Sequence, residues 1–190
     1  MENLYGRYQT ARDGSWQTLI DFDIKSLPVS IHSITNTAGI KVIKNSVAKE
    51  LHSSEIGISI LADNVWHIIY DDTLSQGRIR FTLAHELGHI FLGHTLSGGY
   101  HARTFDTKNR GAEWEADRFA ADLLAPACVL WGLNLHTIEE IKQVCNISYT
   151  SAKIRSERME VLYKRDKFLI SPLERQVYTN FAEYIEKNNK

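Results

Sequence analysis

The sequence contains few cysteines, few prolines and no long hydrophobic run. Its 190 residues include two cysteines, three prolines and eleven glycines. Cys128 and Cys145 are too far apart for a CxxC pair, and two thiols do not make a disulfide framework, so we expect a reducing, cytoplasmic environment. The apolar stretches are far shorter than the roughly 18 residues of a membrane span, and the first residues lack the apolar core of a secretory signal. No membrane association is therefore expected.

Neither sign of charge dominates the chain. Lys and Arg number 22 and Asp and Glu number 23, which gives a formal net charge of -1. This balance excludes a protein that binds nucleic acid through bulk positive charge, and it excludes an acidic disordered tail. The hydrophobic content of 43% is sufficient for a buried core in a chain of this length. We expect an N-terminal extension (1–25), a central domain (26–135) and a C-terminal region (136–190) packed on it.

The first half of the chain predicts one helix and several strands. Apolar residues at helical spacing predict a helix over 27–38. Two β-branched runs on either side of Asp63-Asn64 predict a β-hairpin. The predicted strands are 40–44, 56–62 and 65–70. We expect them to form a small, mainly antiparallel sheet.

The second half of the chain predicts helices. A buried helix begins near Arg78 and ends near Ser97, and a second helix follows at 111–126. The residues between the two helices, 97–112, are polar and irregular, so we expect a loop there. Residues 137–162 predict two short helices, and a further helix follows Ser171. The fold class expected from this order is α+β, with additional C-terminal helices.

The predicted helix that begins near Arg78 contains the sequence His85-Glu86-Leu87-Gly88-His89, an HExxH motif. Residues four apart lie on the same face of a helix, so His85 and His89 can direct imidazole nitrogens at one metal ion. Zinc binds histidine nitrogen at about 2.0–2.1 Å, and a catalytic zinc site keeps one position open for water. Glu86 would lie beside that position and accept a proton from the water.

Acidic residues of the 111–126 helix are the candidates for a third zinc ligand. Glu113 shares the inward face with the apolar residues of this helix, whereas Glu115 falls on another face. A carboxylate on an apolar inward face must be paired or bound to metal, so we predict Glu113 as the third ligand. Asp117, one turn further on, is the predicted acceptor that orients a ligand histidine. Glu115 remains the alternative third ligand.

The next histidine, His94, is five residues after His89. If the helix continues, His94 lies about 180° from His85 and cannot reach the same ion. We therefore interpret His94 as a helix-end or surface histidine. Tyr100 and His101, in the predicted loop, are candidate oxyanion or substrate contacts. The predicted hairpin could offer an edge strand to an extended substrate.

Two motifs together resemble a known family. The segment RFTLAHELGHIFLGH and the segment EWEADRFAADLLAP at 113–126 resemble the ImmA/IrrE family of zinc metallopeptidases, over about residues 28–130. The resemblance implies a zincin-like fold and one zinc ion per chain. It also implies that His85, His89 and a glutamate of the second motif hold the zinc, and that Glu86 is the general base.

The resemblance also implies a substrate. Members of the family usually cleave helix-turn-helix repressors of the phage and mobile-element type. The chain departs from the family pattern at Asp117, where asparagine is frequent, and at Ala125, where methionine is frequent.

Other functions remain open beside a repressor-cleaving zinc endopeptidase. The chain could be a regulatory docking module that keeps the zincin shell without cleaving its partner. It could also be a toxin-like metallohydrolase with a non-peptide substrate, because HExxH does not determine the substrate. Direct nucleic-acid binding by residues 137–162 is not expected, because acidic residues such as Glu157 and Glu160 interrupt the basic ones.

Overall fold

The computed structural model describes residues 4–94, 100–103 and 110–189, and its fold class is α+β, as predicted. The strands are β1 (Lys41–Lys44), β2 (Gly57–Ala62), β3 (Val65–Tyr70) and β4 (Tyr100–Arg103). The longer helices are α1 (Leu4–Asp21), α4 (Gln76–Phe91), α5 (Arg110–Leu124) and α8 (Tyr149–Arg165). The shorter helices are α2 (Ile31–Thr37), α3 (Asn45–Ala48), α6 (Ala127–Gly132), α7 (Ile138–Cys145), α9 (Pro172–Asn180) and α10 (Ala182–Asn188).

The described strands form one sheet in the order β1-β3-β2-β4. β3 pairs parallel with β1, whereas β2 pairs antiparallel with both β3 and β4, so the sheet is mainly antiparallel, as predicted. The predicted hairpin is confirmed: Asp63 and Asn64 form its turn with φ of 50° and 61°, the left-handed conformation of a two-residue hairpin loop. The prediction that the hairpin supplies an edge strand is wrong. Residues 100–103, expected in a loop, form β4 and cover the free side of β2.

Several helices have other bounds than the sequence predicted: the second short helix expected within 137–162 is the 17-residue α8, and the ends of α2 and α4 differ most. α2 begins at Ile31, after Ser30, whose hydroxyl accepts the N–H of Ser33. α4 ends at Phe91 and not near Ser97. Gly93 has φ of 75°, and the N–H groups of Gly93 and His94 donate back to Ile90 O and His89 O at 3.2 and 3.0 Å. This Schellman turn ends the helix, because its N–H groups form hydrogen bonds with carbonyl groups of the last helical turn.

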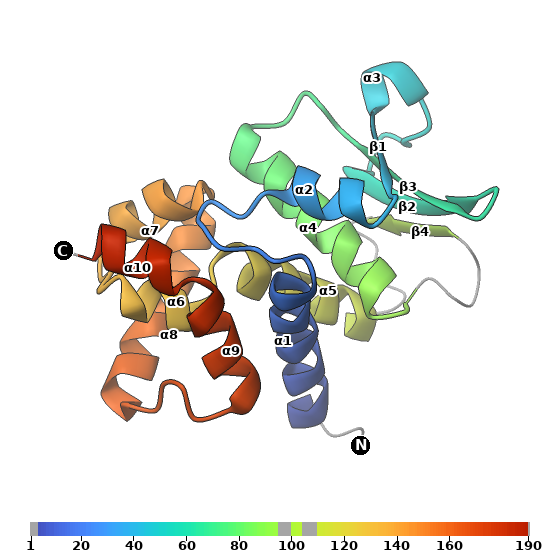
Figure 1. Cartoon of the computed structure of the whole chain (residues 1–190). Coiled ribbons are helices and arrows are strands. Elements are labelled where there is room, and N and C mark those ends of the chain that lie inside the picture. Colours follow the sequence, from blue (N-terminus) through green and yellow to red (C-terminus); the bar gives the residue numbers. More distant parts are fainter. Residues whose placement is uncertain (1–3, 95–99, 104–109, 190) are drawn as a thin grey trace.

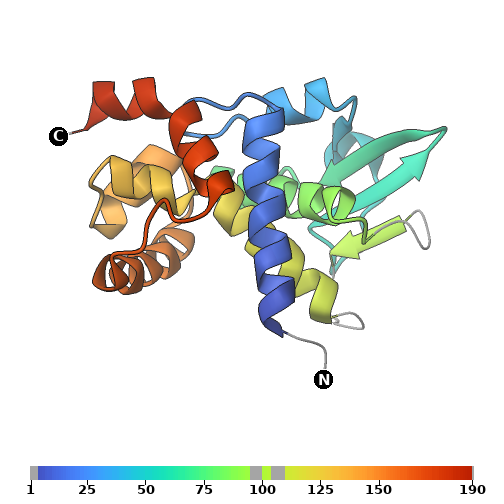
Figure 2. The ribbon, with the colours of Figure 1, turned by 60° about the horizontal axis from the view of Figure 1, so that its bottom comes forward.

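The N-terminal residues, which the sequence pattern left unassigned, contain a long helix that belongs to the main core. α1 packs along α5, and its residues Ala11, Trp16 and Leu19 are buried. Figures 1 and 2 show α1, α4 and α5 between the sheet on one side and the helices that follow α5 on the other. The helices that carry the two sequence motifs therefore lie in the middle of the molecule.

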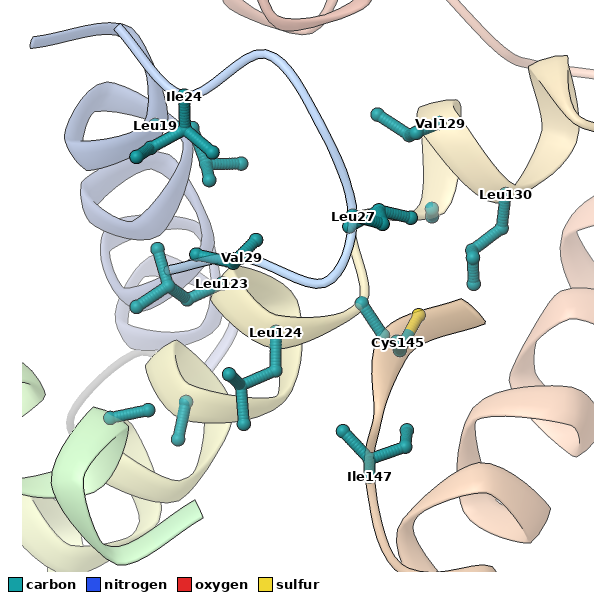
Figure 3. Packing of buried hydrophobic residues seen from close by; sticks show 14 of the residues in the cluster. Leu19, Ile24, Leu27, Val29, Leu123, Leu124, Val129, Leu130, Cys145 and Ile147 are labelled. Atoms are coloured by element: carbon teal, nitrogen blue, oxygen red, sulfur yellow. The ribbon is translucent and has the colours of Figure 1, made fainter. Parts of the chain in front are cut away.

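Figure 3 shows the part of the core where the segment between α1 and α2 meets α5, α6 and the residues around the end of α7. Leu27 and Val29, predicted within a helix, are buried in the extended segment between α1 and α2. The other labelled residues belong to α1, α5, α6 and α7 or follow α1 and α7 directly. They are Leu19, Ile24, Leu123, Leu124, Val129, Leu130, Cys145 and Ile147. One hydrophobic cluster thus includes residues from all these elements.

The C-terminal region begins with the predicted capping box. Thr137 Oγ1 accepts the N–H of Glu140, and the Glu140 carboxylate accepts the N–H of Thr137 at 3.0 Å. The single helix expected after Ser171 is two helices, α9 and α10, which meet at Phe181. None of the described helices has the length and apolar character of a membrane span.

Candidate metal centre

The HExxH residues lie in the buried part of α4, where this helix contacts α5. His85 and His89 are both fully buried. Gly88, between them in the motif, lies against Ala116 of α5: a Cβ atom at position 88 would be 3.1 Å from Ala116 Cα. Because glycine lacks this atom, the two helices approach closely. That approach brings the second motif within reach of the two histidines.

Three side chains converge between α4 and α5. The Nε2 atoms of His85 and His89 are 2.9 Å apart. The carboxylate oxygens of Glu113 lie 3.3 Å from His85 Nε2 and 3.4 Å from His89 Nε2. Among the described residues, His85, His89 and Glu113 form the group of histidine, cysteine and acidic residues whose geometry could hold a metal ion.

The donor set and its spacing suit a zinc ion. Two histidines and one glutamate are an established ligand set of catalytic zinc. Tetrahedral zinc with bonds of about 2.0–2.1 Å separates its ligand atoms by roughly 3.3–3.4 Å. The two distances from Glu113 are 3.3 and 3.4 Å, and the distance of 2.9 Å between the histidine nitrogens is a few tenths of an ångström shorter. The residues present therefore fit the metal that the sequence predicts.

The environment of Glu113 favours its ionised form. Burial raises the pKa of its carboxyl group. Hydrogen bonds from His85 and His89, and the positive charge these residues can carry, outweigh burial, so the net pKa of Glu113 lies well below its ordinary value. A carboxylate that stays ionised is ready to bind a cation at neutral pH.

Each histidine makes a second contact through its Nδ1 atom. His85 Nδ1 lies 2.8 Å from Asp117 Oδ1, on the far side of the ring from Glu113. His89 Nδ1 lies 3.1 Å from His94 Nδ1, and His94 Nε2 lies 2.8 Å from Glu115 Oε2. His94 was interpreted as a helix-end or surface histidine: it does follow the end of α4, but it is not a surface residue, because its side chain is only 11% exposed. α4 ends before His94, and the turn at Gly93 directs His94 back to His89.

The sequence pattern did not place the face of α5 that includes Glu115 towards the core. In the structure, however, this face is covered. Phe119 and Asp122, which share this face, are buried. α1, which the sequence did not predict, lies against α5 at Phe119, and Arg155 of α8 pairs with Asp122. Glu115 lies in a largely buried contact with His94, whereas Glu113 is the acidic residue grouped with the two histidines.

The side chain of Glu86 is fully buried and extends towards β2. Ser59 Oγ of β2 donates a hydrogen bond to Glu86 Oε2. Gly57, also in β2, faces the same carboxyl group: a Cβ atom there would lie 3.1 Å from Glu86 Oε1 and 2.5 Å from Thr82 Cγ2. The strand thus leaves space for Glu86 and fixes its orientation. Neither Ser59 nor Gly57 was predicted as a site residue, because their role depends on how β2 packs against α4.

Comparison with known proteins agrees with the motifs. The model of the peptidase M78 family, described as the IrrE N-terminal-like domain, matches residues 35–157. The chain belongs to this family. No curated protein matches the chain. The matched range contains the sheet, both motif helices and about half of α8, and extends further towards the C-terminus than the predicted resemblance over about residues 28–130.

A pocket of about 280 Å³ lies beside the candidate site of this M78 family member. It lies between α5 and α8, and it includes Asp117, the residue that contacts His85. Its lining is mostly apolar, with Phe81, Ala121 and the exposed Ile154 among its residues. The sequence did not predict this pocket, because α8 is far from the motifs along the chain.

A buried ion cluster holds α8 at this pocket. Arg155 of α8 donates to Asp122 Oδ1 of α5 at 2.7 Å and to the carbonyl oxygen of Ala121 at 2.6 Å. Arg118 pairs with the same carboxylate at 2.7 Å. The wall that α8 contributes is therefore fixed to the second motif helix.

Tyr100 and His101, the predicted oxyanion or substrate contacts, lie in β4, where only the backbone is described. Their side chains lie outside the described part of the chain. The backbone of His101 is opposite Ser59 in the sheet register, and Ser59 donates to Glu86. The two residues are therefore in the strand next to the one that contacts the HExxH glutamate.

Proposed function

We propose that this chain is a zinc-dependent endopeptidase with a zincin-like core, and that it hydrolyses a peptide bond of a helix-turn-helix transcriptional repressor of the phage or mobile-element type. The observation that carries the proposal is the convergence of His85 Nε2, His89 Nε2 and the Glu113 carboxylate at zinc-ligand spacing. Membership of a peptidase family supports peptide hydrolysis as the reaction.

His85, His89 and Glu113 would hold one zinc ion per chain. Bound zinc supplies a Lewis acid, which polarises the scissile carbonyl group and lowers the pKa of water towards about 7. The contact from Asp117 to His85 Nδ1 fixes the ring orientation and holds a proton on Nδ1, so that a bound metal ion would replace the proton that His85 Nε2 donates to Glu113. The depressed pKa of Glu113 keeps its carboxylate charged at neutral pH.

Glu86 is the proposed general base and general acid. Its carboxylate takes a proton from the attacking water and passes that proton to the amine of the leaving peptide. The hydrogen bond from Ser59 holds one carboxylate oxygen of Glu86 in place. The side chain therefore loses less conformational entropy when the transition state forms. Tyr100 and His101 remain candidates for a contact with the developing oxyanion.

The substrate is proposed to lie between β4 and the pocket at α5 and α8. Among the described strands, β4 pairs only with β2, so its other edge can pair with an extended peptide. The pocket beside Asp117 has the size and the apolar lining for one large hydrophobic side chain of that peptide.

The test uses the purified protein and purified helix-turn-helix repressors of the phage or mobile-element type. We expect defined fragments of the repressor, identified by mass spectrometry, and we expect Glu86→Gln to lower the cleavage rate by about 10²–10⁴-fold while it keeps zinc. A docking module would instead act equally well in cells with Glu86→Gln. A toxin-like metallohydrolase would lose its cellular effect with Glu86→Gln but leave the repressor intact.

A further inference from the structure

His94 and Glu115 form a contact chain that ends at one of the candidate zinc ligands. The turn after α4 places His94 Nδ1 3.1 Å from His89 Nδ1, with the ring centroids 5.2 Å apart. Glu115 Oε2 of α5 lies 2.8 Å from His94 Nε2. The side chains of His94 and Glu115 are only 11% and 16% exposed, so the chain of contacts is largely shielded from water.

The chemistry of these groups determines which atom donates and which accepts in each contact. An ionised carboxylate only accepts hydrogen bonds, and a neutral imidazole has one N–H and one acceptor nitrogen. Glu115 therefore places the proton of neutral His94 on Nε2 and leaves His94 Nδ1 as an acceptor. His94 Nδ1 in turn requires a donor, which is the Nδ1–H of His89. This contact holds a proton on His89 Nδ1, so that a bound metal ion would replace only the proton at Nε2, the atom that faces His85 and Glu113.

We propose that Glu115 and His94 act as a positioning relay, which holds His89 in the tautomer that presents Nε2 to the metal and fixes the orientation of its ring. The proposal rests on the metal centre described above. It assigns the two ligand histidines different supports: His85 contacts the carboxylate of Asp117 directly, and His89 reaches the carboxylate of Glu115 through a second histidine.

The relay also gives the second acidic residue of the EWE sequence a role other than that of a ligand. Glu113 and Glu115 are two residues apart, so they cannot both face the histidine pair from one helix. Glu113 contacts the two Nε2 atoms, and Glu115 contacts the outer histidine. Both acidic residues thus serve the same site from different faces of α5.

The first measurement is the zinc dissociation constant, determined by competition with a chromophoric chelator. We expect Glu115→Ala and His94→Ala to bind zinc about 10- to 100-fold more weakly than the wild type, the range found when the outer partner of a ligand histidine is removed. His94→Asn should restore most of the affinity, because its amide oxygen can accept the Nδ1–H of His89. In the His94→Asn protein, adding Glu115→Ala should have no further effect. The matched controls are Glu139→Ala and His32→Ala, which alter exposed residues away from the site.

The second measurement reports the tautomer, which a merely structural role would not change. Nitrogen-15 NMR of the imidazole groups in the metal-free protein, where no bound ion fixes the proton of His89, should show His94 protonated at Nε2 in the wild type and a mixture of tautomers in Glu115→Ala. If the alanine variants do not fold, Glu115→Gln retains the shape and removes the charge, and its zinc affinity should lie below that of the wild type. Equal zinc affinity in all variants, or an unchanged His94 tautomer, would overturn the relay. Failure of the wild type itself to bind zinc would instead overturn the metal centre.

Discussion

At the scale of single residues, Glu174 in the first turn of α9 is a buried carboxyl group, only 7% exposed. Burial raises its pKa above the ordinary 4.5, although backbone N–H groups of residues 169–171 and the charge of Arg12 oppose the shift. The folded protein therefore binds this proton more tightly than the unfolded chain does. The resulting stabilisation is complete below about pH 4.5 and is lost as the pH rises through the raised pKa.

Replacing Glu174 with glutamine removes this titration. We expect the free energy of unfolding of Glu174→Gln, relative to that of the wild type, to rise between about pH 4 and about pH 7, because only the wild type must ionise a buried group. Urea denaturation of both proteins at the two pH values measures the difference. A difference that stays constant with pH would show that Glu174 titrates alike in both states.

The sequence was sufficient to propose the residues that converge at the site. The spacing of four residues places His85 and His89 on one face of a helix, and the apolar pattern places Glu113 on the inward face. His94 was misinterpreted because the argument assumed a continuous helix. Gly93 was the available sequence indication of the helix end, since the turn there has a positive φ that favours glycine.

At the scale of elements, the separation of α4 and α5 depends on Gly88. A methyl group at this position would lie 3.1 Å from both Ala116 Cα and Phe119 Cδ1. We expect Gly88→Ala to lower stability by roughly 1–3 kcal/mol, the usual cost of overpacking, and to weaken zinc binding because it moves Glu113 away from the histidines. Thermal unfolding without metal and chelator competition measure the two effects. An unchanged zinc affinity would mean that the helix separation does not control the site.

The pocket between α5 and α8 allows a prediction about substrate specificity. Ala121 lies in its wall, so Ala121→Trp would fill the space proposed for a hydrophobic side chain of the substrate. We expect the kcat/KM for repressor cleavage to fall by roughly 10- to 200-fold, the range for a misfit in an apolar pocket, with unchanged zinc content. Glu157→Trp, on an exposed part of α8, is the control. Equal losses in both variants would exclude the pocket as a specific subsite.

The elements that the sequence predicted well carry strong local patterns. The hairpin around Asp63-Asn64 and the capping box at Thr137 depend on neighbouring residues alone. β4 was missed because it has only four residues and depends on its pairing with β2. Local periodicity cannot indicate a strand whose main support comes from another part of the chain.

At the scale of the whole molecule, the core extends from α1 to α10 as one hydrophobic cluster. Phe119 of α5 is fully buried in it and packs against Phe91 with ring centroids 6.3 Å apart. We expect the protein to unfold in one cooperative transition.

Phe119→Ala should lower the stability of this core by about 3–5 kcal/mol, which corresponds to a Tm lower by roughly 6–20 °C for a chain of this size. Differential scanning calorimetry of the wild type and the variant measures both the number of transitions and the shift. Two separate transitions, with only one displaced, would show that the C-terminal region unfolds independently.

The position of α1 shows why the overall arrangement could not be predicted in full. Its sequence has no clear apolar stripe, yet its residues Trp16 and Leu19 are buried against α5. α1 lies against Phe119, which shares a face of α5 with Glu115. The burial of one motif helix therefore depends on a segment nearly a hundred residues earlier in the chain.

The most direct test of the account is the metal content of the purified protein, measured by mass spectrometry without exposure to chelators. Wild type, Glu113→Ala and the exposed control Glu139→Ala are compared. The proposed centre predicts about one zinc ion per chain in the wild type and the control, and little zinc in Glu113→Ala. Absence of zinc from the wild type even after zinc is added back, or equal zinc in all three proteins, would contradict the account.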